Sequence, residues 1–205
     1  MSTGNPIGID VSHYQGTINW PEVKSAGNSF VSIKATQYSS GYEYADYYTQ
    51  NIQPARDAGL IAGGFHMLTG TDDGATQGNY FLSVAKPKKG DLLPMLDMEQ
   101  ASGGTPDQVV EAAQGWLQVV EAAVGKKPFI YTTATYWNQI GNPSGFENNP
   151  LWVAEYGVPS PSLPQGWSLY TIWQHSDTGQ VDGISATVDL DIFNAPADVL
   201  NDFRV

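Results

Sequence analysis

The chain has 205 residues and is 41% hydrophobic, so one domain can bury a full core, and it has no cysteine for disulfides or thiolate metal sites. Acidic residues outnumber Lys and Arg by 21 to 9, which gives a formal net charge of −12. This composition leaves no basic face for nucleic acid or an anionic membrane, and no stretch reaches the roughly 18 apolar residues of a membrane span.

Short apolar stretches recur along the chain and alternate with helical patterns, which favours an α/β fold with a mostly parallel sheet. Several of these stretches are almost continuously apolar, as is typical of strands covered on both faces. The eight expected strands are residues 7–11, 30–35, 61–67, 92–98, 128–132, 151–155, 169–173 and 188–192.

The clearest helix is expected over residues 106–124, where Thr105 and Gln108 form a capping box and Gly125 ends the helical pattern. Further helices are expected near residues 45–58 and 75–84.

The later connections differ, because residues 141–150 and 157–166 are rich in Gly, Pro, Ser and Asn and indicate loops. The first five strands are therefore expected to have helical connections and the last three mostly not. No linker divides the chain, which predicts a single domain over residues 1–205.

Four acidic residues lie at or near the ends of expected strands: Asp10 in the first, Asp97 and Glu99 in the fourth, and Asp189 in the eighth. In a parallel barrel the carboxyl ends of all strands share one face, and active sites are built there. The sequence therefore predicts that these carboxyl groups meet at one mouth.

The spacing of Asp97 and Glu99 suits acid–base chemistry, because residues i and i+2 of a strand point to the same side about 6.5 Å apart. Glycosidases pair two carboxyl groups at such separations, and crowding of like charges raises the pKa of one of them. An acidic pair can also be a solvated strand face, but the apolar residues 92–96 just before this pair favour a site.

Aromatic and polar side chains near strand ends could bind a flat sugar face, although core packing is an alternative for each of them. The candidate substrate-binding residues are Phe65, His66, Tyr131, Trp152, Tyr156, Trp173 and Gln174. The histidines lack metal-ligand spacing, so no metal is expected; a metal-dependent hydrolase using His66 and His175 with the acids is kept as an alternative.

Several motifs in order across nearly the whole chain resemble those of the glycoside hydrolase family 25 lysozymes, the N-acetylmuramidases. They are GIDVSHYQG (8–16), FVSIKAT (30–36), AGLIAGGFH (58–66), PMLDME (94–99), PFIYTT (128–133), PLWVAEYG (150–157), IWQ (172–174) and VDLDIFN (188–194).

The resemblance implies a modified TIM-like barrel, (β/α)5(β)3, with eight mostly parallel strands. It implies hydrolysis, without a cofactor, of the β-1,4 bond between N-acetylmuramic acid and N-acetylglucosamine in peptidoglycan, with retention. Glu99 matches the family's acid/base, and Asp97 matches an acid that either orients the substrate's acetamido group or acts as nucleophile. Asp10 and Asp189 match supporting acids of the pocket. Tyr131 and Trp173 match positions of its aromatic lining.

Two positions depart from the motifs: Gln37 stands where Glu is frequent, and Asp191 stands where Asn is usual. Asp191 should point the same way as Asp189, so an additional acid there is expected to shift the pH profile. We expect a secreted, antimicrobial, monomeric enzyme whose partner is peptidoglycan. A non-catalytic carbohydrate-binding barrel is the alternative, because folds are reused for different functions.

Overall fold

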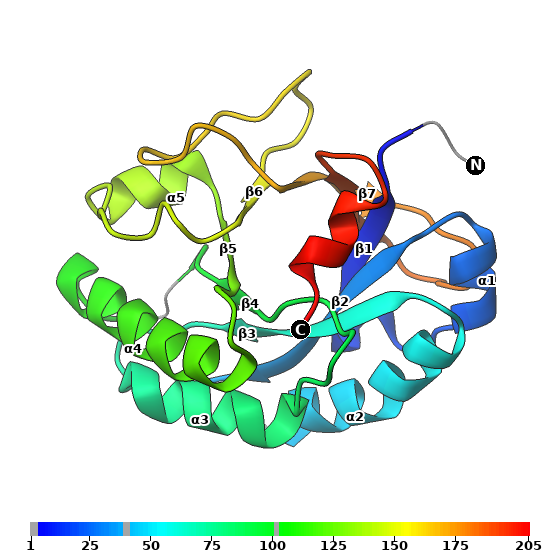
Figure 1. The fold of residues 1–205 in the computed structure, drawn as a ribbon, viewed down its shortest axis with the longest axis horizontal. Coiled ribbons are helices and arrows are strands. Elements are labelled where there is room, and N and C mark those ends of the chain that lie inside the picture. Colours follow the sequence, from blue (N-terminus) through cyan, green and yellow to red (C-terminus); the bar gives the residue numbers. More distant parts are fainter. Residues whose placement is uncertain (1–3, 39–41, 101–102) are drawn as a thin grey trace.

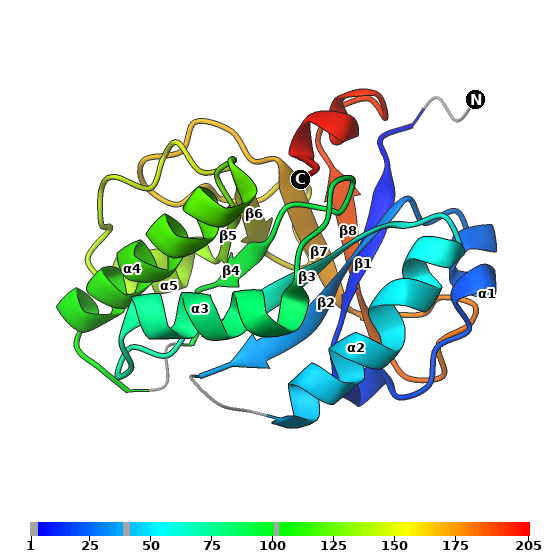
Figure 2. The same ribbon diagram turned by 60° about the horizontal axis from the view of Figure 1, so that its bottom comes forward.

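The computed structural model describes residues 4–38, 42–100 and 103–205, and within these ranges eight strands close into a barrel in chain order (Figure 1). β1 to β7 run parallel, whereas β8 runs antiparallel to both of its neighbours, β7 and β1 (Figure 2). The strands are β1 (Ile7–Val11), β2 (Phe30–Gln37), β3 (Ile61–Met67), β4 (Met95–Asp97), β5 (Phe129–Thr132), β6 (Leu151–Ala154), β7 (Ile172–Gly179) and β8 (Val188–Phe193). The expected barrel of mostly parallel strands is confirmed.

An α-helix follows each of β1 to β5, whereas β6, β7 and β8 follow one another through loops. In Figure 1, α2, α3 and α4 lie along one side of the barrel, and in the yellow-to-orange chain after α5 long loops connect β6 and β7. This is the expected (β/α)5(β)3 arrangement. The helices are α1 (Trp20–Ser25), α2 (Tyr42–Asp57), α3 (Gly74–Ala85), α4 (Pro106–Val124) and α5 (Ala134–Gln139), with 3-10 turns η1 (His13–Gln15) and η2 (Val199–Phe203). In the described part of the chain, no helix has the length and apolarity needed to cross a membrane.

The helices over 45–58, 75–84 and 106–124 are found within a few residues of their expected positions. In α4, the Thr105 side chain accepts from the backbone of Gln108, the Gln108 side chain accepts from the backbone of Thr105, and Gly125 ends the helix with left-handed backbone, as the sequence predicts. α1 and α5 were not expected, because each has six residues and is too short to show a helical period.

The expected strand at residues 169–173 is wrong in its bounds, since β7 covers Ile172–Gly179. The second half of β7 is polar and partly exposed, so it has no apolar pattern, and its strand conformation comes from antiparallel pairing with β8. β4 is also shorter than the expected 92–98. It begins after Pro94, which has no N–H to donate to a strand ladder.

The interior of the barrel is apolar at one end, where the rings of Phe30 and Phe129 pack edge-on against Trp152. A Cβ atom on Gly8 would lie 2.4 Å from the Phe30 ring, so only glycine at this position lets Phe30 fill the barrel. The interior is thereby closed at the end where the parallel strands begin, which we call the floor.

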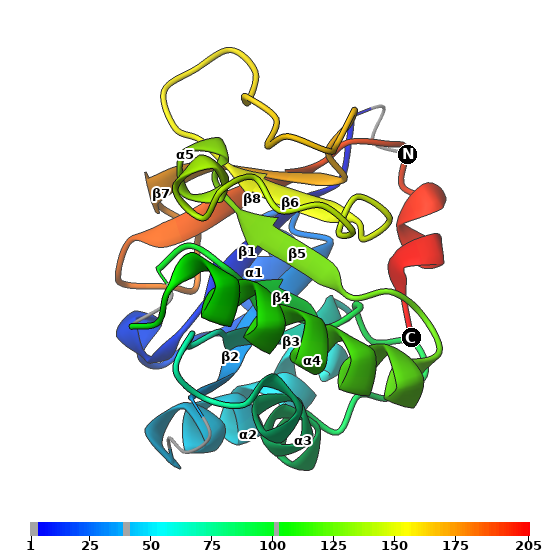
Figure 3. The ribbon, with the colours of Figure 1, turned by 90° about the vertical axis from the view of Figure 1, so that its left-hand side faces the viewer.

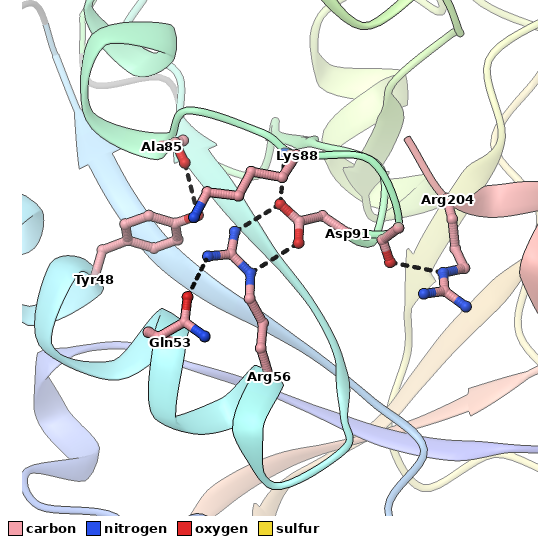
Figure 4. A network of polar contacts seen from close by, with 8 residues as sticks. Tyr48, Gln53, Arg56, Ala85, Lys88, Asp91 and Arg204 are labelled. Carbon is pink, nitrogen blue, oxygen red and sulfur yellow. Dashed lines mark hydrogen bonds and ion pairs between the residues drawn. The ribbon is translucent and has the colours of Figure 1, made fainter.

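A partly buried ion pair connects the helical layer to the floor (Figure 4). The Arg56 guanidinium on α2 donates through Nε to Asp91 Oδ1 at 2.8 Å and through an Nη atom to Asp91 Oδ2 at 2.6 Å. The Lys88 backbone N–H also donates to Asp91 Oδ2, at 2.7 Å. The Asp91 carbonyl accepts from the N–H of Val205, so the same residue holds the chain's last segment.

We predict that Asp91→Asn lowers the free energy of unfolding by about 2 kcal/mol or more, because it leaves the Arg56 charge without its partner in a site where Arg56 is 17% exposed. The exposed pair of Lys127 and Glu121, at 43% and 41% exposure, provides the matched control. Glu121→Gln should change the same quantity by less than about 0.5 kcal/mol. Urea denaturation of both variants measures the difference, and equal effects would contradict the structural importance of the Arg56–Asp91 pair.

Candidate active site

A groove of about 570 Å³ opens at the end of the barrel where the parallel strands finish. Its lining is rich in acidic residues and aromatic rings. The one Lys or Arg among the described lining residues is Lys34 on β2. The lining includes Asp10, Lys34, Asp97, Glu99, Asp177, Asp189, Tyr14, Tyr44, Phe65, Tyr131, Tyr156, Gln37 and Gln174. The four expected catalytic acids therefore meet at one mouth.

Asp189 lies at the mouth, but not because its strand ends there, as the expectation of parallel strands implied. It is the second residue of β8, and because β8 is antiparallel, the start of this strand lies at the mouth. Asp189 is there the direct register partner of Asp10, which is near the end of β1. Strand reversal thus brings together two carboxyl groups that come from opposite ends of their strands.

Asp97 is the last residue of β4, and Glu99 lies two residues further on, beyond the strand. Both line the groove, while the intervening Met98 is fully buried in the layer between barrel and helices. The alternation expected from the sequence therefore persists past the end of the strand. The backbone stays extended here because the N–H of Met98 still pairs with β5, donating to the carbonyl of Tyr131 at 2.8 Å.

Burial raises the pKa of both carboxyl groups. For Asp97, which is 6% exposed, desolvation is the largest cause and the charge of Glu99 the next, while the ammonium of Lys34 acts in the opposite direction. For Glu99, desolvation also dominates, and the hydrogen bond from Tyr131 and the charge of Lys34 lower the pKa by less. The two carboxyl groups therefore keep a proton to a higher pH than free carboxyl groups in water do.

Lys34 was not among the expected site residues. Its Nζ donates to Gln37 Oε1 at 2.7 Å and lies 4.5 Å from the ring centre of Tyr44. The sequence did contain a signal, because Phe30, Ser32 and Lys34 alternate along β2 and Phe30 points into the barrel. A lysine is rarely buried without a polar or charged partner, so its inward position on this strand indicated a polar site.

Polar side chains join Glu99 to Asp10 across the groove. The Tyr131 hydroxyl lies 3.3 Å from Glu99 Oε2 and donates to Gln174 Oε1 at 2.9 Å. The same Gln174 oxygen accepts from the Tyr156 hydroxyl at 2.5 Å, and Gln174 Nε2 donates to Asp10 Oδ2 at 2.6 Å. Gln174 therefore has its orientation fixed by its neighbours, and the expected residues Tyr131, Tyr156 and Gln174 form one network.

The expected candidate His66 lies outside the groove. It is fully buried, with Nδ1 2.8 Å from Thr36 Oγ1 and Nε2 3.0 Å from Gln77 Oε1. Burial lowers its pKa to about 4. His66 thus packs between the barrel and its helices, so the structure does not form the alternative grouping of His66 and His175 with the acids. Among the residues that the structure describes, no group of three or more His, Asp or Glu is placed to hold a metal ion.

Trp152 and Trp173 also lie away from the groove. Trp152 is fully buried inside the barrel, where its Nε1 donates to Asp191 Oδ1 at 2.9 Å. Trp173 precedes the inward-pointing Gln174 on β7 and so points outward, and its Nε1 donates to the Glu155 carbonyl at 2.8 Å. Both rings were expected at the groove because they lie near strand ends, but Trp173 points outward, and Trp152, although inside the barrel, packs at its floor.

Comparison with known proteins relates the chain to one family. Residues 9–184 match the family model described as glycosyl hydrolases family 25. "Lysozyme M1" of Streptomyces globisporus is 39% identical over 208 residues, with 95% of this chain and 70% of that protein covered. "N,O-diacetylmuramidase" of Chalaropsis sp is 35% identical, with 83% of this chain and 87% of that protein covered.

Solved structures agree with the sequence comparison. A bacterial lysozyme from Streptomyces coelicolor superposes with a TM-score of 0.91 at 36% identity, covering 99% of this chain and 98% of that one. A family GH25 lysozyme from Aspergillus fumigatus gives a TM-score of 0.85 at 32% identity, covering 98% of this chain and 99% of that one.

We predict that Asp189 makes the protein less stable as the pH rises. Burial raises its folded pKa from 3.8 to about 6, so its favourable contribution is complete below about pH 4 and is lost as the pH rises through about 6. Asp189→Asn should therefore be more stable than the wild type at pH 7, and the difference should shrink on acidification to about pH 4. Urea denaturation across this range measures it.

Asp73 provides a control of opposite sign. Its pKa is lowered by the hydrogen bonds from Thr76 at the start of α3, so its contribution is present above its unfolded pKa and is lost on acidification. Asp73→Asn should therefore deviate from the wild type in the reverse direction. A difference between Asp189→Asn and wild type that is constant over pH would contradict the raised pKa of Asp189.

Proposed function

Because the chain belongs to glycosyl hydrolases family 25, we propose that this glycoside hydrolase is a lysozyme that cuts the β-1,4 bond between N-acetylmuramic acid and N-acetylglucosamine in peptidoglycan with retention. The observation that carries the proposal is the pair Asp97 and Glu99 at the end of β4, in a groove with Asp10 and Asp189 opposite. The glycan strand would lie across this groove, at the face where barrels of this type place their active sites.

Glu99 is the general acid and base in this proposal. Its pKa is raised by burial, so it keeps a proton for the leaving glycosidic oxygen. Tyr131 has one hydroxyl hydrogen and its shorter contact is to Gln174, so its hydrogen bond to Glu99 offsets only part of the effect of burial. After bond cleavage, the Glu99 carboxylate takes a proton from the attacking water.

Asp97 acts on the other side of the reacting carbon, either as nucleophile or by holding the 2-acetamido group so that its carbonyl attacks. Asp97 Oδ1 is buried and has no hydrogen-bond donor among the described residues. An acetamido N–H would supply that donor, which favours the second role. The Lys34 charge keeps Asp97 closer to its ionised form than burial alone would.

The remaining acids stabilise charge. The transition state of glycoside hydrolysis carries positive charge on the sugar ring, and fixed negative groups aimed at it lower its free energy. Asp10 is fixed by Gln174, and Asp189 is fixed by its register with Asp10 on the neighbouring strand. Phe65, Tyr131 and Tyr156 supply ring surfaces on the groove wall for contact with the sugar.

We place this activity outside the cell, since relatives named lysozyme and muramidase act on cell walls, and we propose a secreted, antimicrobial role for a monomer. The domain proposed to carry it spans residues 1–205. No cofactor is required by the mechanism. The net charge of −12 means that contact with an anionic wall must come from shape and ring stacking rather than from long-range attraction.

We predict that Glu99→Gln lowers kcat for release of reducing sugar from purified peptidoglycan by about 10²- to 10⁴-fold, because the amide cannot transfer a proton. Circular dichroism and urea denaturation should show that the variant is folded. Glu111→Gln, on the exposed face of α4, should keep wild-type kcat. Near-native activity of Glu99→Gln would refute its role, and absence of release by the folded wild type would instead indicate a barrel that only binds carbohydrate.

We also predict that the first product has the β configuration at its new reducing end, which proton NMR of the early reaction can measure. An α product would contradict retention.

A substrate whose 2-acetamido group is replaced by hydroxyl separates the two roles of Asp97. Loss of turnover is expected if the acetamido carbonyl attacks, whereas preserved turnover with accumulation of a glycosyl-enzyme would identify Asp97 as the nucleophile.

A further inference from the structure

Asp191 is a buried carboxyl group that the proposed mechanism does not use. It lies on β8 two residues beyond Asp189 and is 1% exposed. Its register partners are Gly8 on β1, which has no side chain, and Gln174 on β7. The Asp191 carboxyl therefore occupies the layer between the apolar floor and the groove, beneath the acids of the mouth.

The hydrogen bonds of Asp191 are incomplete. Oδ1 accepts from Trp152 Nε1 at 2.9 Å, whereas no N–H or O–H of the described residues donates to Oδ2. Besides Trp152 and the register partner Gln174, this carboxyl lies beside the carboxyl of Asp10, which in turn contacts that of Asp189. Two carboxyl groups can share a hydrogen bond only when one of them is protonated. The row Asp189–Asp10–Asp191 therefore has to retain at least one proton.

Each of the two inner carboxyl groups accepts one hydrogen bond from a neutral N–H, from Trp152 for Asp191 and from Gln174 for Asp10, so depth of burial and bond length distinguish them. Asp10 accepts a short bond of 2.6 Å from Gln174 Nε2, which stabilises the ionised form of Asp10. Asp191 is 1% exposed against 7% for Asp10, and no Lys or Arg of the described residues acts on its pKa. The titratable groups that face Asp191 are Asp10 from β1 and Asp189 on its own strand, both acids, while β6 and β7 present the uncharged Trp152 and Gln174.

We propose that Asp191 is a positioning residue that stays protonated in the working enzyme and donates a hydrogen bond to the Asp10 carboxylate. The bond fixes Asp10 from below while Gln174 fixes it from the side. Asp10 then presents its negative charge to the reacting sugar in one orientation. The kinetic part of this inference rests on the proposed lysozyme function, and the protonation of Asp191 does not.

A pair of variants tests the donor role. Asp191→Asn keeps the shape and replaces the acid O–H by an amide N–H that can donate to Asp10, with the amide oxygen left for Trp152. Asp191→Leu has similar volume and no donor. We expect Asp191→Asn to keep kcat within about threefold of wild type, and Asp191→Leu, shown to be folded by circular dichroism, to lose about tenfold or more in kcat with little change in KM. Equal losses in both variants would overturn the proposal.

A measurement without substrate tests the protonation directly. In wild-type protein labelled with ¹³C at the aspartate carboxyl, the Asp191 signal is the one missing from Asp191→Asn. We expect this signal to stay at the position of a protonated acid at about pH 5 and above, where a free aspartate is ionised. Titration near the ordinary aspartate pKa of about 4 would overturn the proposal. If the wild type released no sugar but the signal stayed protonated, the lysozyme assignment would fail while the assigned state of Asp191 remained.

Discussion

Desolvation of carboxyl groups is the constraint on which the arrangement at the mouth of the barrel depends. Asp10, Asp97 and Asp191 are each at most 7% exposed, and burial is the largest cause of the raised pKa of each of them. A barrel wall without enough cations for these acids must retain protons instead. The ammonium of Lys34 offsets part of the charge on the β4 side, so the β1 and β8 side depends more heavily on shared protons.

The fold supports this arrangement by dividing the barrel interior in two. Aromatic rings fill the floor, and Gly8 makes room for one of them, so this end of the interior is packed with apolar side chains. Above the rings, strand alternation places the carboxyl of Asp191 beneath those of Asp10 and Asp189. Trp152, one of the rings, donates a hydrogen bond to Asp191. The proposed chemistry uses the upper layer, and its electrostatic properties come from the dry layer beneath.

Sequence patterns predicted most of the fold because apolar strands and capped helices are local features. Asp97 and Glu99 could be located because their alternation is also local. His66, Trp152 and Trp173 were assigned to the groove wrongly, since the direction of a side chain depends on barrel closure and on helices packed outside it. The reversal of β8 was not anticipated, although it decides how Asp189 meets Asp10. Lys34 was missed because the apolar character of its strand concealed an inward polar position.

The reversal of β8 also determines where the chain leaves the barrel. Since β8 starts at the mouth and finishes at the floor, η2 and the final residues lie beside Leu92 and Asp91, as the red segment in Figure 3 shows at one end of the barrel. A peptide fused after Val205 would therefore emerge on the side opposite to the groove. Affinity handles, fluorescent labels or surface tethers joined at this point would leave the glycan path open, and an immobilised form would present its mouth outward.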